Sequence, residues 1–194
     1  VGALRLPLAF GRAAHGDFTL SENGALATMR VDDNSARAAA SRAVMRSGRH
    51  FAQLTVLDGI YMFFGVIRPG WDVEGGESAA APMEGGDGHC LHDAGDGSRY
   101  PGGYGWEGMQ AVREQGDRLG MLLDLDQGSM TVYKNDERLG VMATGLSGEY
   151  SWAVSLFAQG VLSRFWRAAS IRSDTPPPDA SEPSLVPQSH LLVS

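Results

Sequence analysis

Apolar and polar residues alternate after Gly116, where Leu119, Met121 and Leu123 are separated by single residues. A repeat of two residues is that of a β-strand with one buried face. Turn-forming residues follow at 126–128, and a second turn is expected at Asn135 and Asp136 between two further apolar runs. This pattern predicts a three-stranded antiparallel meander. Its expected strands are 118–124, 130–133 and 139–142.

Short runs rich in β-branched and aromatic residues recur on both sides of the meander. They predict strands at 49–57, 61–67, 89–92, 152–157 and 161–166. Two stretches favour short helices instead, the alanine-rich 35–42 and the segment 107–114. Many short strands with glycine-rich turns predict an all-β antiparallel sandwich. The side chains expected between its sheets are Leu119, Met121, Leu123, Val132, Val154 and Leu156.

Glycine and proline divide the chain of 194 residues unevenly. Seventeen of the 26 glycines lie between Gly59 and Gly128, which predicts long loops in that half of the sandwich. Five of the nine prolines lie between Pro176 and Pro187, in a serine-rich stretch with too little apolar area to fold. We therefore expect an N-terminal extension at 1–16, one folded domain at 17–167 and a flexible tail or linker at 168–194.

Charge and composition narrow the choice of partners. The net charge is −7, and the basic residues are scattered arginines with one lysine, Lys134. Nucleic acids and anionic membranes attract clustered positive charge, so neither is expected as a partner. No apolar stretch reaches the roughly 18 residues that a membrane span needs. A single cysteine, Cys90, forms no internal disulfide, which favours a reducing, intracellular and specifically cytoplasmic setting.

Several motifs suggest a cofactor or a metal but lack the required context. The segment 103–108 fits G-x-G-x-x-G, yet no crossover helix follows it, so no dinucleotide is expected. Asp124, Asp126 and Gly128 resemble the start of a calcium loop, but glycine stands one position too early. On a strand, His89 and His92 would point to opposite faces and could not share a zinc ion. We expect neither a cofactor nor a metal.

Catalysis also lacks a signature. The carboxylates Asp72, Glu74 and Glu77 lie on a glycine-rich loop, where nothing nearby supplies an apolar pocket to raise a pKa. The chain has no G-x-S-x-G motif, and Cys90 has no evident activating partner. We therefore predict a non-enzymatic protein.

Aromatic residues on the predicted loops are the remaining candidates for function. Tryptophan, tyrosine and arginine dominate the energetics of protein interfaces. Such residues could equally close the ends of the core, because aromatic burial is large wherever it occurs. If they bind a partner, at least three of the arginine and aromatic side chains should converge at one end of the sandwich. The candidate partner-binding residues are Arg68, Pro69, Trp71, Tyr100, Tyr104 and Trp106.

The order of motifs resembles that of a SPRY (B30.2-related) domain, most closely the Ran-binding-protein type. The segments Asp17–Gly24, Ser47–Ala52 and Gly65–Asp72 are similar to the family's opening strand, its S-G-x-H-Y motif and its P-G-W loop. The most specific match is Gly116–Asp124 with Val132–Asn135, similar to the family's G-D-x-hydrophobic-G and Y-K-N-G meander. Asp136 replaces the usual glycine, and both Asn135 and Asp136 tolerate the positive φ of such a turn.

The resemblance implies a fold and a function. SPRY domains are concanavalin-like sandwiches that bind short peptides or protein surfaces through loops. They lack catalytic activity and usually belong to larger proteins such as ubiquitin-ligase adaptors or scaffolds. We therefore expect a monomeric module for a protein or peptide ligand. The alternative is a lectin-like sandwich that binds carbohydrate, because lectins share the architecture and also use loop aromatics.

Overall fold

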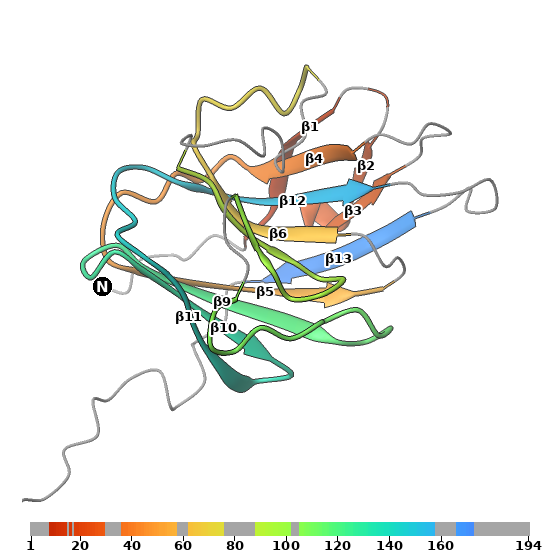
Figure 1. Cartoon of the computed structure of the whole chain (residues 1–194). Coiled ribbons are helices and arrows are strands. Elements are labelled where there is room, and N and C mark those ends of the chain that lie inside the picture. The colour runs from red at the N-terminus through yellow and green to blue at the C-terminus, as the bar shows by residue number, and fades with distance from the viewer. Residues whose placement is uncertain are drawn as a thin grey trace, which may run out of the picture.

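The chain forms two antiparallel sheets packed face to face (Figure 1). The computed structural model describes residues 8–14, 16, 18–29, 36–57, 62–75, 88–101, 105–157 and 166–172. Sheet A has the strand order β1 (Phe10–Ala13), β4 (Ala36–Ser41), β12 (Ser151–Phe157), β6 (Met62–Ile67), β7 (Cys90–Asp93) and β8 (Arg99–Tyr100). Sheet B has the order β11 (Glu137–Thr144), β10 (Ser129–Lys134), β9 (Arg118–Asp124), β5 (Arg49–Val56), β13 (Trp166–Arg172), β3 (Leu26–Met29) and β2 (Phe18–Ser21). A short 3₁₀ turn, η1 (Glu22–Gly24), joins β2 to β3.

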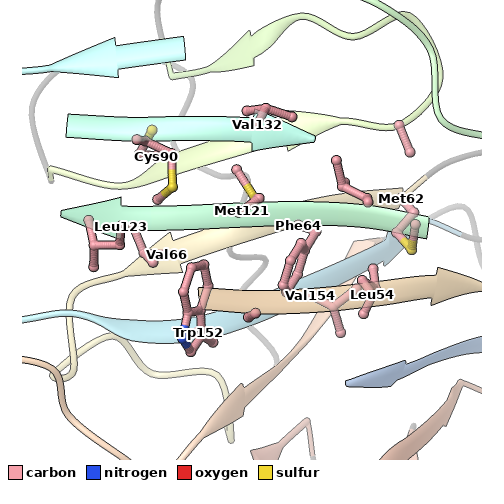
Figure 2. Close-up of a cluster of buried hydrophobic side chains, with 14 of the residues drawn as sticks. Leu54, Met62, Phe64, Val66, Cys90, Met121, Leu123, Val132, Trp152 and Val154 are labelled. Atoms are coloured by element: carbon pink, nitrogen blue, oxygen red, sulfur yellow. The ribbon is translucent and has the colours of Figure 1, made fainter. Parts of the chain in front are cut away.

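The inner faces of the two sheets share one apolar core. Phe64 of β6 and Trp152 of β12 stack with ring centroids 5.7 Å apart, and Met121 and Leu123 of β9 belong to the same cluster (Figure 2). The fold class predicted from the sequence is thereby confirmed. So is the burial of the six predicted core side chains, none more than 5% exposed: Leu119, Met121, Leu123, Val132, Val154 and Leu156.

The predicted meander is confirmed as β9, β10 and β11, which pair in sequence order. Asn135 and Asp136 form the turn between β10 and β11, with φ angles of 52° and 73°. Asparagine and aspartate adopt this left-handed conformation more readily than other side chains. The turn therefore forms although neither of its two central residues is glycine.

The helix predicted at 35–42 is wrong, because this alanine-rich stretch forms strand β4. β4 lies between β1 and β12 and is covered on both faces. Ala39 faces the main core, whereas Ala38 and Ala40 belong to a second apolar cluster on the outer face of sheet A. The intrinsic helix preference of alanine is small, and pairing on both edges of a buried strand outweighs it.

Three other expectations differ from the structure. The segment 107–114 contains turns and irregular backbone instead of a helix. The last strand begins at Trp166 and runs to Arg172, instead of spanning 161–166, whose first five residues lie outside the described part. β1 pairs with β4 although it falls within the expected extension at 1–16, so the sandwich begins upstream of Asp17. The tail from Ser173 lies outside the described residues.

No helix in the described part of the chain is long and apolar enough to cross a membrane.

Candidate functional site

Arg68 ties two loops together at one end of the sandwich. It follows β6 directly, and its Nη1 donates hydrogen bonds to the carbonyl oxygens of Ser147 at 2.7 Å and Glu149 at 3.2 Å. Its guanidinium carbon lies 4.4 Å from the centroid of the Tyr150 ring, a cation–π arrangement. Gly88 leaves room for the guanidinium, because a β-carbon there would lie 2.3 Å from Nη2. Arg68 therefore joins the β6–β7 and β11–β12 connections.

Arg12 of β1 fixes the same loop from the other side. Its guanidinium donates to the carbonyl oxygens of Pro69, at 2.7 Å, and Trp71. The Trp71 indole meets the His89 ring edge-on, with centroids 4.6 Å apart. Asp72 closes the next turn by accepting the Gly75 N–H at 2.8 Å. The loop at 68–75 is thus held by contacts along most of its length.

Trp71 and Tyr100 lie together on the outer face of sheet A. Both pack against the same buried cluster, which includes Ile67 and Leu91. Tyr100 also meets Phe63 edge-on, with ring centroids 5.1 Å apart. All three aromatic residues are only partly buried. We call Phe63, Trp71 and Tyr100 the outer aromatic surface.

Trp106 lies on the other face of sheet A and does not share a surface with Trp71 and Tyr100. Its Nε1 donates to the Gly97 carbonyl at 2.7 Å, in the turn after Asp93, which pairs with Phe63 near the start of β6. Trp71 instead follows the end of β6 and packs with His89 on the outer face of sheet A, whereas Trp106 packs with His92 on the inner face. Trp106 packs against the main core and fills the space between the edges of the two sheets. Tyr104 lies outside the described residues.

The motif residues of the meander form a clasp instead of a chemical site. Asp117 Oδ1 accepts a hydrogen bond from Asn135 Nδ2 at 2.9 Å, and its Oδ2 accepts the Glu114 N–H at 3.1 Å. Lys134 Nζ lies 3.6 Å from Oδ2 and donates to the Ala111 carbonyl at 2.9 Å. Burial raises the pKa of Asp117, but these donors and the Lys134 charge outweigh it and hold the pKa below its ordinary value. The clasp fixes the segment before β9 to the β10–β11 turn.

Asp136, the second residue of the β10–β11 turn, has partners on the outer face of sheet B. It accepts a hydrogen bond from Gln53 Nε2 at 2.8 Å and pairs with Arg118. Across this face Phe51 and Tyr133 meet edge-on above Gly120, with ring centroids 5.8 Å apart. A β-carbon on Gly120 would lie 2.9 Å from the Phe51 ring. Sequence reasoning missed this face because its aromatic residues fall on strands and not on loops.

The candidate chemical groups are in apolar surroundings. Burial raises the pKa of the Cys90 thiol to about 12, with only partial relief from the Arg99 charge. Burial lowers the pKa of His92 to about 4, offset in part by the Gln110 backbone and Asp96. At neutral pH the thiol is protonated and the imidazole neutral. His89 contacts Trp71 and His92 contacts Trp106, so the two histidines lie on different faces of sheet A.

Within the described residues, no group of three or more histidine, cysteine or acidic side chains is placed to hold a metal ion. Asp124 accepts hydrogen bonds from the backbone N–H groups of Asp126 and Gln127, at 3.1 Å and 2.9 Å. These are the contacts of an Asx turn. The sequence that resembles a calcium loop is therefore built as a hairpin turn.

Comparison with solved structures identifies the architecture. The SPRY domain of human HERC1 covers 86% of this chain and 97% of its own, with a TM-score of 0.62 and 15% sequence identity. The fold is that of a SPRY domain. The TRIM65 PSpry domain is similar over 88% of this chain and 90% of its own, with a TM-score of 0.55 and 15% identity. No family model and no curated protein matches the sequence. At this level of identity the similarity to other SPRY domains establishes the fold alone.

Proposed function

We propose that this SPRY-fold chain is a non-catalytic module that binds a protein or a short peptide through the outer aromatic surface. The observation that carries the proposal is the position of Trp71 and Tyr100. Trp71 follows β6 and Tyr100 lies on β8, far apart in sequence, yet both pack on one cluster with part of each side chain accessible. Partly exposed aromatic side chains on a fixed backbone provide a large contact area at little entropic cost.

The neighbouring loop supports the proposal because it is already ordered. Arg12 donates to the Pro69 carbonyl within the loop, and Arg68, the residue before Pro69, donates to the Ser147 carbonyl of the β11–β12 connection. A partner that docks here does not have to freeze the loop first, which lowers the free-energy cost of association. Since the Arg68 guanidinium is engaged within the chain, we assign it a positioning role in place of the direct partner contact expected from the sequence.

The wider assignment follows the same reasoning. We propose an adaptor or scaffold part of a larger protein, of the Ran-binding-protein type of SPRY domain, that acts as a monomer in the cytoplasm. The net charge of −7 argues against nucleic acid and anionic membrane as ligands. Cys90 is a free, buried thiol, which suits a reducing compartment.

The test is a peptide-array screen with the full chain, followed by calorimetric titration of the peptides it retains. Trp71→Ala and Tyr100→Ala should each weaken binding by about tenfold or more, the scale of an interface hot spot. Met109→Ala is the matched control. Met109 is also a large apolar residue and is 46% exposed, but it lies beside Trp106, away from the outer aromatic surface. Thermal melts of all three variants check that the fold is retained.

Unchanged affinity in both aromatic variants would remove the outer aromatic surface from the proposal. Calcium-dependent binding on a glycan array, with no peptide retained, would favour the lectin-like alternative.

A further inference from the structure

His92 is a buried imidazole that the proposed binding function does not use. It lies on β7 opposite Phe64 of β6 and Arg99 of β8, and cross-strand partners share a face. Phe64 belongs to the main core, so His92 also points between the sheets. The residue is 0% exposed, and neither ring nitrogen makes a well-aligned hydrogen bond.

A single irregular segment, Trp106–Val112, covers this imidazole from the open side of the sandwich. We call it the latch. The Trp106 ring meets the His92 ring edge-on with centroids 6.1 Å apart, and its Nε1 is bonded to the Gly97 carbonyl. The far end of the latch is held by the Val112 N–H, 2.9 Å from the Ala94 carbonyl. Between these points Gly108 lies against Leu139 of β11, where a β-carbon would come 2.3 Å from the Leu139 carbonyl oxygen.

The latch is a wall around the histidine that is held by isolated contacts, including the Lys134 bond to the Ala111 carbonyl, instead of by strand pairing. β6 and β8 flank β7 with ladder hydrogen bonds, and the opposite side of the ring faces the core. The latch is not paired with any strand through backbone hydrogen bonds, and its Met109 side chain is 46% exposed. Segments with few backbone hydrogen bonds open at lower free energy than the strands they cover. Water therefore reaches His92 most readily when the latch lifts.

We propose that His92 and the latch form an acid-sensitive device, in which protonation of His92 releases Trp106–Val112 while the two sheets stay folded. An imidazolium needs water or an acceptor for both N–H groups, and the closed latch offers the Gln110 backbone to the ring but no access to water. Lifting the latch hydrates the ring and exposes the Trp106 indole at the side of the sandwich. The device is independent of the outer aromatic surface, which lies on the other face of sheet A.

The charged groups around His92 do not cancel the expected pH dependence of latch opening. Asp96, in the turn after β7, favours the charged form, and so does the backbone of Gln110 on the latch. Arg99 of β8 opposes a second positive charge, while the Cys90 thiol on the same face is neutral. Asp93 alternates to the outer face, and Glu107 on the latch is exposed. Phe64 of β6 adds no charge. The effect of burial is larger than the effects of these groups and lowers the pKa of His92 to about 4.

The size of the effect follows from linkage. An exposed imidazole titrates near 6.5. Between about pH 6.5 and pH 4, His92 therefore binds a proton when the latch is open and stays neutral when the latch is closed. Between pH 7 and pH 5 the ratio of open to closed molecules should rise about 20-fold for these two values. The change is fully developed below about pH 4, where both forms are protonated.

The experiment is fluorine NMR of the full chain labelled with 5-fluorotryptophan, titrated from pH 7 to pH 4. The four tryptophans give separate probes, and the Trp106 signal is assigned by its loss in Trp106→Phe. We expect the Trp106 signal to move toward the shift of solvated indole as the pH falls. The Trp152 signal should stay in place, because Trp152 is buried in the core between the sheets. The His92 ring, followed by proton NMR of the same chain, should titrate with the same midpoint as Trp106.

Two variants sharpen the result. His92→Gln removes the titrating group and should leave the Trp106 signal constant across the range. His50→Gln is the matched control, because His50 bonds the Ser47 carbonyl in an exposed turn, and it should keep the transition. A Trp106 signal that does not respond to pH overturns the proposal, as does one that changes only together with Trp152. If His92→Gln does not fold, unequal midpoints for His92 and Trp106 in the unsubstituted chain overturn it equally.

Discussion

Replacing Asp117 with alanine tests whether the meander motif stabilises the sandwich through its clasp. The substitution removes acceptors for Asn135 Nδ2 at 2.9 Å and for the Glu114 N–H at 3.1 Å. It also removes the carboxylate 3.6 Å from Lys134 Nζ. Lys134 keeps its hydrogen bond to the Ala111 carbonyl, and the Arg118 N–H keeps the Asn135 side-chain oxygen. The loss is therefore confined to the bonds that Asp117 itself makes.

The magnitude can be worked out from these contacts. A hydrogen bond to a charged acceptor contributes roughly 1.5–3 kcal/mol, and an ion pair that is partly exposed adds about 1 kcal/mol or less. The Glu114 N–H lies near the surface and regains water, so only a fraction of its bond is lost. We expect Asp117→Ala to lower the free energy of unfolding by about 3 kcal/mol, the combined scale of these bonds.

The effect should also depend on pH. Burial raises the pKa of Asp117, but the hydrogen bonds and Lys134 leave it below its ordinary value of 3.8. A carboxyl whose pKa is lowered by folding stabilises the protein above its unfolded-state pKa, and this stabilisation is lost as the pH falls through the folded-state value. The difference between the original chain and Asp117→Ala should be complete above about pH 4 and should shrink in stronger acid.

Urea denaturation at pH 7 measures the loss as a shift in midpoint at unchanged slope. Asp72→Ala serves as the control, since Asp72 is exposed and caps a single backbone N–H at 2.8 Å. Asn135→Ala combined with Asp117→Ala should show coupling, because the two side chains share one hydrogen bond. A loss below about 0.5 kcal/mol for Asp117→Ala, the range of ordinary surface changes, would refute the clasp.

Three further predictions concern the packing around the sheets and the burial of Cys90. Leu123→Ala should cost about 2–5 kcal/mol in the free energy of unfolding, as for other buried leucines, and a thermal melt near that of the original chain would contradict its place between the sheets. Gly65→Ala should cost about 3 kcal/mol or more, because its β-carbon would lie 2.1 Å from the Cys90 carbonyl oxygen. Gly70→Ala, with no heavy atom within 4 Å, is its control, and equal melts for the two would be inconsistent with the close β6–β7 approach. Because burial raises the pKa of Cys90 to about 12, a thiol reagent at pH 8 should label the native chain far more slowly than the chain in urea, and equal rates would show that the thiol is accessible.

Local patterns in the sequence were sufficient for the meander and the core. Leu119, Met121 and Leu123 occupy every second position, and a strand turns every second side chain to the same face. Asn135 and Asp136 mark the turn because their side chains tolerate positive φ. These features depend on residues next to one another in the chain, so they can be read without the fold.

Where the local sequence preference was ambiguous, contacts with distant parts of the chain determined the secondary structure. The alanines of β4 favour a helix slightly in isolation, but the neighbouring strands β1 and β12 and the burial of both faces make them a strand. The segment 107–114 was predicted as a helix, yet the anchoring of Trp106 and Val112 to the β7–β8 region draws it across the side of the sandwich. In both cases contacts distant in sequence outweigh a propensity of a few tenths of a kcal/mol per residue.

The sequence by itself determined the class of fold and the residue types from which a binding surface could be made. Only the tertiary structure decided that Trp71 and Tyr100 lie on one cluster while Trp106 packs on the other face of sheet A, and that Arg68 bonds the chain's own carbonyl groups. It also buried His92 beneath a segment that begins 14 residues later. Side-chain periodicity is set by neighbouring backbone bonds, whereas the meeting of loops depends on strand order and sheet packing, which no local pattern encodes.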